Sequence, residues 1–176
     1  VLLKMLKVQI RSPFSFEPYH QRKTKPFDYH NFGLGFIRPL IDAELSSVRG
    51  LQNVDVMVQQ IQNGENVLLF ANHQTEADPL IINLLLEKSH SAFATDMIFT
   101  AGNRVTTDPL AIIFSMGCNL LCIYSKKHIE DIPEQKEERQ EHNKRTMRLM
   151  SEMLAEGSKC IFMAPSGGRD RLNSQG

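Results

Sequence analysis

The sequence predicts an α/β fold in which a mixed, partly parallel sheet is flanked by helices. Short apolar runs without polar alternation are typical of strands buried on both faces, and they occur at residues 67–71, 97–101, 119–124 and 159–164. Segments with helical spacing of apolar residues separate these runs. Strands that alternate with helices indicate a sheet with at least some parallel strands.

The first third of the chain predicts helices and an extended segment. Residues 1–10 are apolar with two lysines interspersed, which fits either the end of a helix from an upstream region or a membrane-surface helix. Three prolines within 12–26 predict an extended segment, which its aromatic rings hold against the body. Two glycines and a proline within 28–41 allow only a short or broken helix. Apolar residues at i, i+3, i+7 and i+10 predict a helix over 51–62, ended by Gly64.

Residues 67–87 form a strand, a polar turn and a helix, and the rest of the chain is organised around this corner. Asp78-Pro79 starts the helix, because Asp is a favourable N-cap and Pro is favoured at the first helical position. The corner places His73 and Asp78 together at one edge of the sheet. Ligands of open α/β sheets usually bind at such strand-to-helix corners.

The later elements repeat this alternation. Residues 91–94 are predicted to add a short strand before the run at 97–101. Asp108-Pro109 predicts a second helix start, and Gly117 stops that helix. The charged stretch 129–141 is typical of a solvated loop and the exposed face of a helix, which continues to Gly157.

Composition limits the class of protein. The 176 residues are 41% hydrophobic and 23% charged, which is typical of one globular domain with a sizeable core. A formal net charge of zero gives no global indication of binding to nucleic acid. Apolar runs are shorter than the roughly 18 residues of a membrane helix, so we expect no transmembrane segment. The odd set Cys118, Cys122 and Cys160 has no zinc-ligand spacing and predicts reduced core thiols, with no metal site and no cofactor.

His73 and Asp78 are candidates for a general base and its orienting partner. A neutral imidazole takes a proton from an alcohol at pH 7, and a carboxylate on its far nitrogen fixes the tautomer and stabilises the imidazolium that forms. No serine or cysteine lies between the two residues, so the substrate's own hydroxyl would be the nucleophile. The alternative is that Asp78 only caps the helix and His73 is an ordinary loop histidine.

Basic clusters follow two of the predicted strands, which end near residues 124 and 164. Lys126, Lys127 and His128 follow the first strand, and a glycine pair with Arg169 and Arg171 follows the second. If the strands are parallel, these cations converge on the edge that holds His73. Arginine forks match phosphate oxygens, so the clusters predict a phosphate site. The alternative is that the arginines pair with surface acids, and the absence of GxxxxGK[ST] gives no indication of a nucleotide.

Several motifs carry a family resemblance over about residues 12–171. NHQTEADP (72–79), YSKKH (124–128) and APSGGRDR (164–171) resemble the soluble plastidial glycerol-3-phosphate acyltransferases of plants and algae. PFSFEPYH (13–20), PFDY (26–29) and FIRPL (36–40) resemble the stretch ahead of the catalytic motif in that family. HxxxxD is shared by many glycerolipid acyltransferases. APSGGRDR is more specific, because most relatives carry a glutamate where Ser166 stands.

The resemblance implies transfer of a fatty acyl group to the sn-1 hydroxyl of glycerol 3-phosphate, which gives lysophosphatidate in the first step of glycerolipid synthesis. It implies an acyl carrier protein thioester, or acyl-coenzyme A, as the donor, and a monomer in the plastid (chloroplast) stroma. His73 and Asp78 match the family's base and charge-relay partner. The residues that match its phosphate-binding set are Lys127, His128, Arg169 and Arg171.

The chain departs from the family at both ends, so we expect a fragment of a longer protein. Residues 1–11 match at most a remnant of the family's helical N-terminal domain, and residues 12–176 match an incomplete α/β catalytic domain. One alternative is therefore a truncated, non-catalytic product that keeps the phosphate pocket. Another is an acyltransferase that uses lysophosphatidate, against which Ser166 argues.

Overall fold

The computed structural model describes residues 1–125, 129–130 and 132–165. These residues form a five-stranded sheet with strand order β1-β4-β3-β5-β2. The strands are β1 (Tyr19–His20), β2 (Val67–Phe70), β3 (Ile98–Ala101), β4 (Asn119–Cys122) and β5 (Cys160–Met163). β2, β5, β3 and β4 are parallel, whereas β1 pairs antiparallel with β4. The predicted mixed, partly parallel sheet is therefore confirmed.

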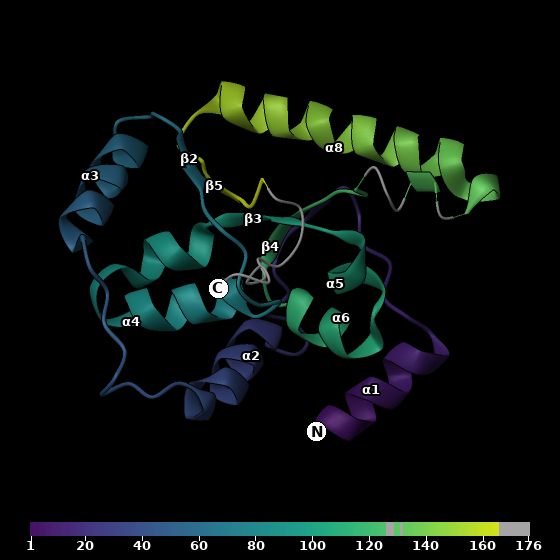
Figure 1. Cartoon of the computed structure of the whole chain (residues 1–176), viewed down its shortest axis with the longest axis horizontal. Helices are drawn as coiled ribbons and strands as arrows, with labels where there is room; N and C mark the ends of the chain where they lie inside the picture. Colours follow the sequence, from purple (N-terminus) through teal and green to yellow (C-terminus); the bar gives the residue numbers. More distant parts are fainter. Residues whose placement is uncertain (126–128, 131, 166–176) are drawn as a thin grey trace, which may run out of the picture.

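Helices cover both faces of this sheet (Figure 1). They are α1 (Leu2–Arg11), α2 (Tyr29–Ile37), η1 (Arg38–Leu40), α3 (Leu51–Gln62), α4 (Asp78–Asp96), α5 (Asn103–Thr107), α6 (Pro109–Ser115), η2 (Pro133–Gln135) and α8 (Lys136–Glu156). α8 packs Met150, Met153 and Leu154 onto one face of the sheet. On the other face, side chains of α2 to α6 pack against a core that includes Phe99, Leu120 and Phe162.

The N-terminal segment is held to the body as the aromatic pattern predicts. α1 packs against α6, and buried Gln9 of α1 lies 3.9 Å from the sulfur of Met116. The rings of Phe14, Phe16 and His20 form edge-to-face contacts with centroids 4.8 to 5.5 Å apart. The division into a remnant domain (1–11) and a catalytic domain (12–176) stays a prediction.

The strand predicted at residues 91–94 is wrong, because these residues belong to α4. Ala94 is fully buried, and Phe93 packs against the core from the helix. A single non-helical residue, His90 with φ −140° and ψ 46°, bends α4 just before this turn. A short, mostly apolar stretch such as residues 91–94 fits a buried helix turn as well as a strand, so the local pattern cannot distinguish them.

Glycines end two helices where the sequence predicts. Gly64, with φ +87°, follows α3 in the left-handed region that glycine adopts without a steric penalty. Gly157 ends α8 with φ +79°, and its Cα lies against the carbonyl of Gly64 so closely that a side chain would not fit. The two turns therefore pack together ahead of the neighbouring strands β2 and β5.

The parallel strands bring four chain segments to one edge of the sheet. The carboxyl ends of β2, β3, β4 and β5 share this edge, so the segments after Phe70, Ala101, Cys122 and Met163 leave the sheet on the same side. This is the edge at which open α/β sheets bind ligands.

Candidate active site

His73 and Asp78 lie together in the turn between β2 and α4. Nδ1 of His73 is 2.8 Å from Oδ2 of Asp78. The side chains are 27% and 14% exposed, respectively, so the pair is shielded but reachable from solvent. The ladder between β2 and β5 continues to Ala71, whose N–H donates to the carbonyl of Met163 at 3.0 Å, and this fixes where the turn starts.

The Asp78 carboxylate faces back along the chain into the turn. Its Oδ2 also accepts the N–H of Gln74 at 3.1 Å, and its Oδ1 accepts the N–H of Thr75 at 3.0 Å. Asp78 is itself the first residue of α4, and no side-chain cap bond is made at that helix start. The predicted N-cap role of Asp78 is therefore wrong, whereas Pro79 lies in the first turn of α4 as predicted. The cap-only alternative fails for the same reason.

These three bonds assign the proton on the imidazole. An ionised carboxylate only accepts hydrogen bonds, and two backbone N–H groups already donate to this one. Nδ1 of His73 must therefore donate the third bond. In the neutral ring this leaves a lone pair on Nε2, and among the described residues nothing donates to it. The corner thus holds an oriented imidazole with a basic nitrogen directed away from its partner.

One ion pair next to this corner is not predicted by the sequence pattern. Nη1 of Arg104 lies 3.2 Å from Oε1 of Glu76, which stands between His73 and Asp78 in the chain. Arg104 follows β3, so it reaches the same sheet edge as His73. Clusters of cations predict an anion site, and the lone arginine after Gly102 and Asn103 belongs to no such cluster.

The four predicted phosphate-binding residues, Lys127, His128, Arg169 and Arg171, lie outside the described residues, as does Ser166. The structure does describe how the chain leaves β4 towards the first cluster. Asn143 of α8 pairs with the backbone of Tyr124: its Oδ1 accepts the N–H and its Nδ2 donates to the carbonyl, both at 2.8 Å. The hydroxyl of Thr146 also donates to the carbonyl of Cys122, at 2.7 Å.

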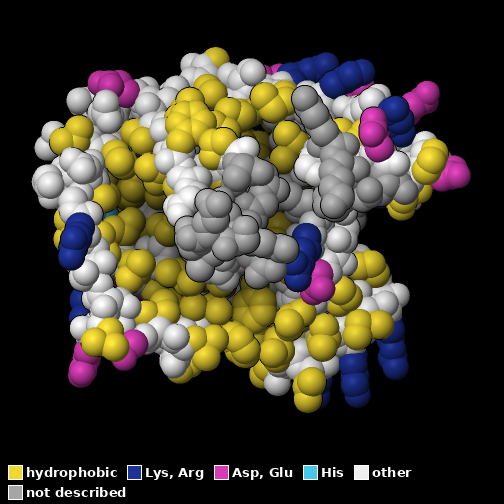
Figure 2. Space-filling model, viewed as in Figure 1, with side chains coloured by type: hydrophobic (Ala, Val, Ile, Leu, Met, Phe, Trp, Pro, Cys, Tyr) yellow, Lys and Arg dark blue, Asp and Glu magenta, His cyan; other side chains and the backbone are white. Residues whose placement is uncertain are grey.

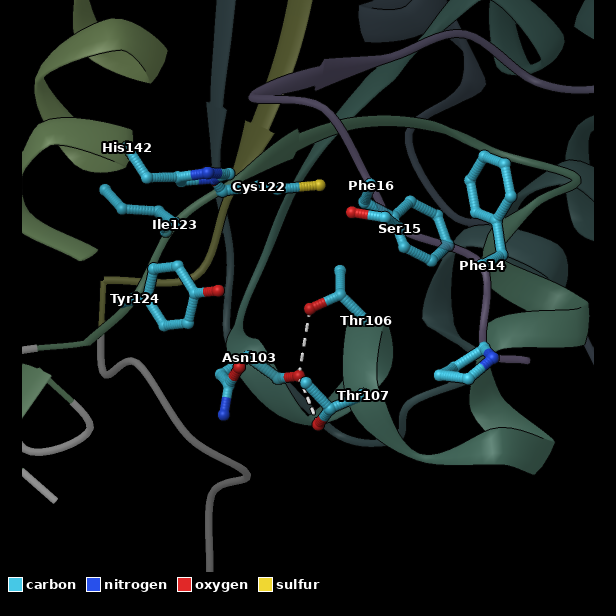
Figure 3. Close-up of a pocket in the computed structure, with 11 residues that line it drawn as sticks. Phe14, Ser15, Phe16, Asn103, Thr106, Thr107, Cys122, Ile123, Tyr124 and His142 are labelled. Atoms are coloured by element: carbon cyan, nitrogen blue, oxygen red, sulfur yellow. Dashed lines mark hydrogen bonds between the residues drawn. The ribbon is translucent and has the colours of Figure 1, made fainter. Parts of the chain in front are cut away.

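A pocket of about 280 Å³ opens beside the end of β4 (Figure 3). The close-up shows the ring of Tyr124, the thiol of Cys122 and the Phe16 ring around it, with Asn103 and the α5 threonines opposite. None of its lining residues comes from the turn at 71–77. The pocket is therefore separate from the His73 corner, although both lie at the carboxyl edge of the sheet.

The cysteines are unsuited to nucleophilic or metal chemistry. Cys118, Cys122 and Cys160 are free and buried, as the sequence predicts. Burial raises the pKa of each thiol to about 12, so all three remain protonated near neutral pH. Within the described ranges, His, Cys, Asp and Glu side chains form no group of three that could hold a metal ion.

Comparisons with known proteins find similarity along most of the chain. Residues 48–175 match the family described as Acyltransferase. The chain is 47% identical over 173 residues to a chloroplastic glycerol-3-phosphate acyltransferase of Cucurbita moschata, covering 98% of this chain and 39% of the relative. The corresponding enzyme of Spinacia oleracea is 46% identical, with 97% and 36% covered, and that of Arabidopsis thaliana 44%, with 93% and 36% covered. The chain thus spans less than two fifths of the length of these relatives.

Proposed function

This chain belongs to the acyltransferase family, and we propose that it carries the catalytic corner of a glycerol-3-phosphate 1-O-acyltransferase. The reaction transfers a fatty acyl group from a thioester to the sn-1 hydroxyl of glycerol 3-phosphate and gives lysophosphatidate. The observation that carries the proposal is the 2.8 Å bond between His73 Nδ1 and Asp78 Oδ2, which leaves Nε2 free to act as a base. The printed names of the relatives supply the substrate.

The corner supports a direct transfer without an acyl-enzyme intermediate. Nε2 of His73 takes the proton from the glycerol hydroxyl while its oxygen attacks the thioester carbonyl. The new C–O bond forms, the C–S bond breaks, and the imidazolium returns its proton to the leaving thiolate. Asp78 stabilises the imidazolium between these steps, because its carboxylate lies against Nδ1–H throughout.

The phosphate of the substrate is assigned to the basic clusters after β4 and β5. Lys127, His128, Arg169 and Arg171 match the family's phosphate-binding set, and in the chain they follow strands that end at the same edge as His73. Arginine forks and lysine charges suit a phosphate dianion. This assignment rests on sequence position and resemblance.

The acyl chain needs an apolar surface next to His73. Phe70, the last residue of β2, remains 62% exposed although it lies only three positions before His73. Figure 2 shows hydrophobic side chains over much of one face of the molecule, with most charged side chains at its rim. A large exposed apolar patch marks a binding surface. We assign it to the fatty acyl group.

The donor, the location and the oligomeric state follow the family resemblance. We propose acyl carrier protein thioester as the donor, with acyl-coenzyme A as the competing thioester, and a monomeric protein in the plastid stroma. The relatives are chloroplastic. No helix among the described residues is long and apolar enough to cross a membrane.

An acyl-transfer assay tests the proposal. The chain is incubated with labelled glycerol 3-phosphate and either acyl carrier protein thioester or acyl-coenzyme A, and lysophosphatidate is measured. We expect product, and a loss of at least about 10²-fold in rate for His73→Ala, because general base catalysis contributes about 10²–10⁴-fold. Calorimetry should show that the variant still binds glycerol 3-phosphate. Binding without turnover in the wild type would refute catalysis by this chain and favour the truncated, non-catalytic alternative.

A further inference from the structure

Glu76 lies in the middle of the catalytic turn, and its side chain is held from outside that turn. Oε1 of Glu76 lies 3.2 Å from Nη1 of Arg104. Glu76 stands three residues after His73 and two before Asp78. The Asp78 carboxylate fastens the first half of the turn by accepting two of its backbone N–H groups. A restraint at Glu76 therefore acts on the remaining segment between the two catalytic side chains.

Arg104 reaches Glu76 from a fixed position. It follows the buried strand β3 and is the second residue of α5. Two threonine hydroxyls of α5 donate to the carbonyl of Asn103 at 2.9 Å, as the dashed lines in Figure 3 show. Ser115 of α6 donates its hydroxyl to the carbonyl of Val105 at 2.7 Å. The residues on both sides of Arg104 are thus held by hydrogen bonds, within α5 at Asn103 and to α6 at Val105.

The strand order determines which chain segments this ion pair joins. β5 lies between β3, which leads to Arg104, and β2, which leads to Glu76. The pair therefore joins the segments that follow two strands on either side of β5. It connects the catalytic turn to the segment that follows β3, in the middle of the sheet. In the chain, β5 is followed by residues 164–171.

The pair contributes little to the stability of the fold. The Arg104 side chain is 69% exposed and that of Glu76 is 31% exposed. Exposed ion pairs joined through one nitrogen and one oxygen contribute weakly to folding, because solvent screens them and both side chains lose conformational freedom. The effect of this pair should therefore be local to the turn.

We propose that Arg104 is a positioning residue for acyl transfer, which acts through Glu76 to hold the turn that carries His73 and Asp78. This inference rests on the proposed function. Reacting groups must be held within a fraction of an ångström of the productive geometry, and a misplacement of about 1 Å costs up to about 10²-fold in rate. Arg104 therefore affects the turnover number and leaves the affinity for glycerol 3-phosphate unchanged.

The test compares Arg104→Gln, Glu76→Gln and the double variant in the acyl-transfer assay. We expect Arg104→Gln to lower kcat about tenfold in the wild-type background and to lower it little further in the Glu76→Gln background, because the contact between the two side chains is then already lost. KM for glycerol 3-phosphate should stay within about twofold in all three. Arg104→Lys should restore most of kcat, because lysine keeps a positive charge at this position for Glu76.

The matched control is Arg38→Gln. Arg38 of η1 forms an equally exposed ion pair with Glu87 of α4, with two bonds of 2.7 Å and exposures of 54% and 39%. Glu87 lies nine residues beyond Asp78, more than two turns along α4. This variant should keep the wild-type kcat, which separates a local effect of Arg104 from the general loss of a surface ion pair.

Amide hydrogen exchange supplies a second measurement that needs no turnover. The N–H groups of Gln74 and Thr75 are protected by Asp78 while the turn is ordered. Their exchange should accelerate about twofold to fivefold in Arg104→Gln and Glu76→Gln, and not in Arg38→Gln. If the wild type transfers no acyl group, the proposed function fails, and exchange alone decides the positioning role. Unchanged exchange would overturn the inference, and so would a KM that rises in Arg104→Gln but not in Glu76→Gln.

Discussion

Replacement of Asp78 by asparagine probes the catalytic corner at nearly constant volume. The carboxylate accepts three hydrogen bonds, from His73 Nδ1 and Gln74 N at Oδ2 and from Thr75 N at Oδ1. An amide has only one oxygen, so one of the two positions must become an NH₂ group. If the oxygen stays near His73, the NH₂ faces the N–H of Thr75. If the amide oxygen instead faces the N–H of Thr75, the NH₂ group faces the imidazole and favours the imidazole tautomer that is protonated on Nε2.

Either arrangement lowers activity far more than stability. Loss of a charge-assisted bond with a donor left facing a donor costs about 1.5–3 kcal/mol in the free energy of unfolding. The catalytic loss is larger, because the imidazolium loses its carboxylate partner in both arrangements, and in the second the required tautomer also becomes the minor one. For an oriented His–Asp pair this amounts to about 10³–10⁴-fold in kcat, or about 4–5.5 kcal/mol in the activation free energy.

Asp108→Asn is the matched control. Asp108 precedes Pro109 at a second helix start, and there Oδ1 does cap the helix by accepting the N–H groups of Leu110 and Ala111 at 2.9 and 3.0 Å. Asparagine is as favourable an N-cap as aspartate, so both activity and stability should change little. Urea unfolding gives the free energy of unfolding, and the acyl-transfer assay gives kcat. A loss below about tenfold for Asp78→Asn, or equal losses in the two variants, would refute the orienting role of Asp78.

Three further predictions concern the body of the protein. Burial lowers the pKa of His20 below 6.5, so the folded state binds this proton less tightly than the unfolded state, and stability should decrease as the pH falls through 6.5 towards the folded pKa. His20→Gln should show a smaller decrease in the urea midpoint between about pH 7.5 and 5.5, and an identical decrease would contradict this. The buried thiols of Cys118, Cys122 and Cys160, with pKa values of about 12, should react with an alkylating agent only after unfolding, and rapid labelling of the native protein would disprove their protection. Asn143→Ala removes two hydrogen bonds to the backbone of Tyr124 and should lower the free energy of unfolding by about 1–3 kcal/mol, whereas an unchanged urea midpoint would show that α8 does not hold this segment.

Four strands were predictable from the sequence because each is an unbroken apolar run, and β3, β4 and β5 are buried on both faces as such a run predicts. Burial of β2 on both faces was predicted wrongly, because Leu68 and Phe70 are 42% and 62% exposed. β2, β3, β4 and β5 lie within the runs at residues 67–71, 97–101, 119–124 and 159–164. β1 was not predictable, because its two residues form a strand only by pairing with β4, and their own pattern carries no strand signal. The five-residue helix α5 is likewise shorter than any periodicity that could indicate it.

Some features of the candidate site were predictable from the sequence and others were not. The spacing of His73 and Asp78 at a strand-to-helix corner predicts their contact, which the structure confirms at 2.8 Å. The direction of the Asp78 carboxylate was predicted wrongly, because helix starts favour a capping aspartate and only the folded turn supplies competing N–H donors. The pairing of Glu76 with Arg104 depends on the strand order, which the sequence alone does not determine. The phosphate assignment of Lys127, His128, Arg169 and Arg171 stays a prediction.

The central claim is that His73 offers a basic Nε2 while Asp78 holds its Nδ1 proton. Nitrogen-15 NMR of the imidazole tests this most directly, because the shifts of the two ring nitrogens distinguish the tautomers. For the neutral ring of His73 we predict a protonated Nδ1 and an unprotonated Nε2, and a shift towards the opposite tautomer in Asp78→Asn. A wild-type His73 that carries its proton on Nε2 would contradict the account, since that nitrogen could not then accept a proton from the substrate.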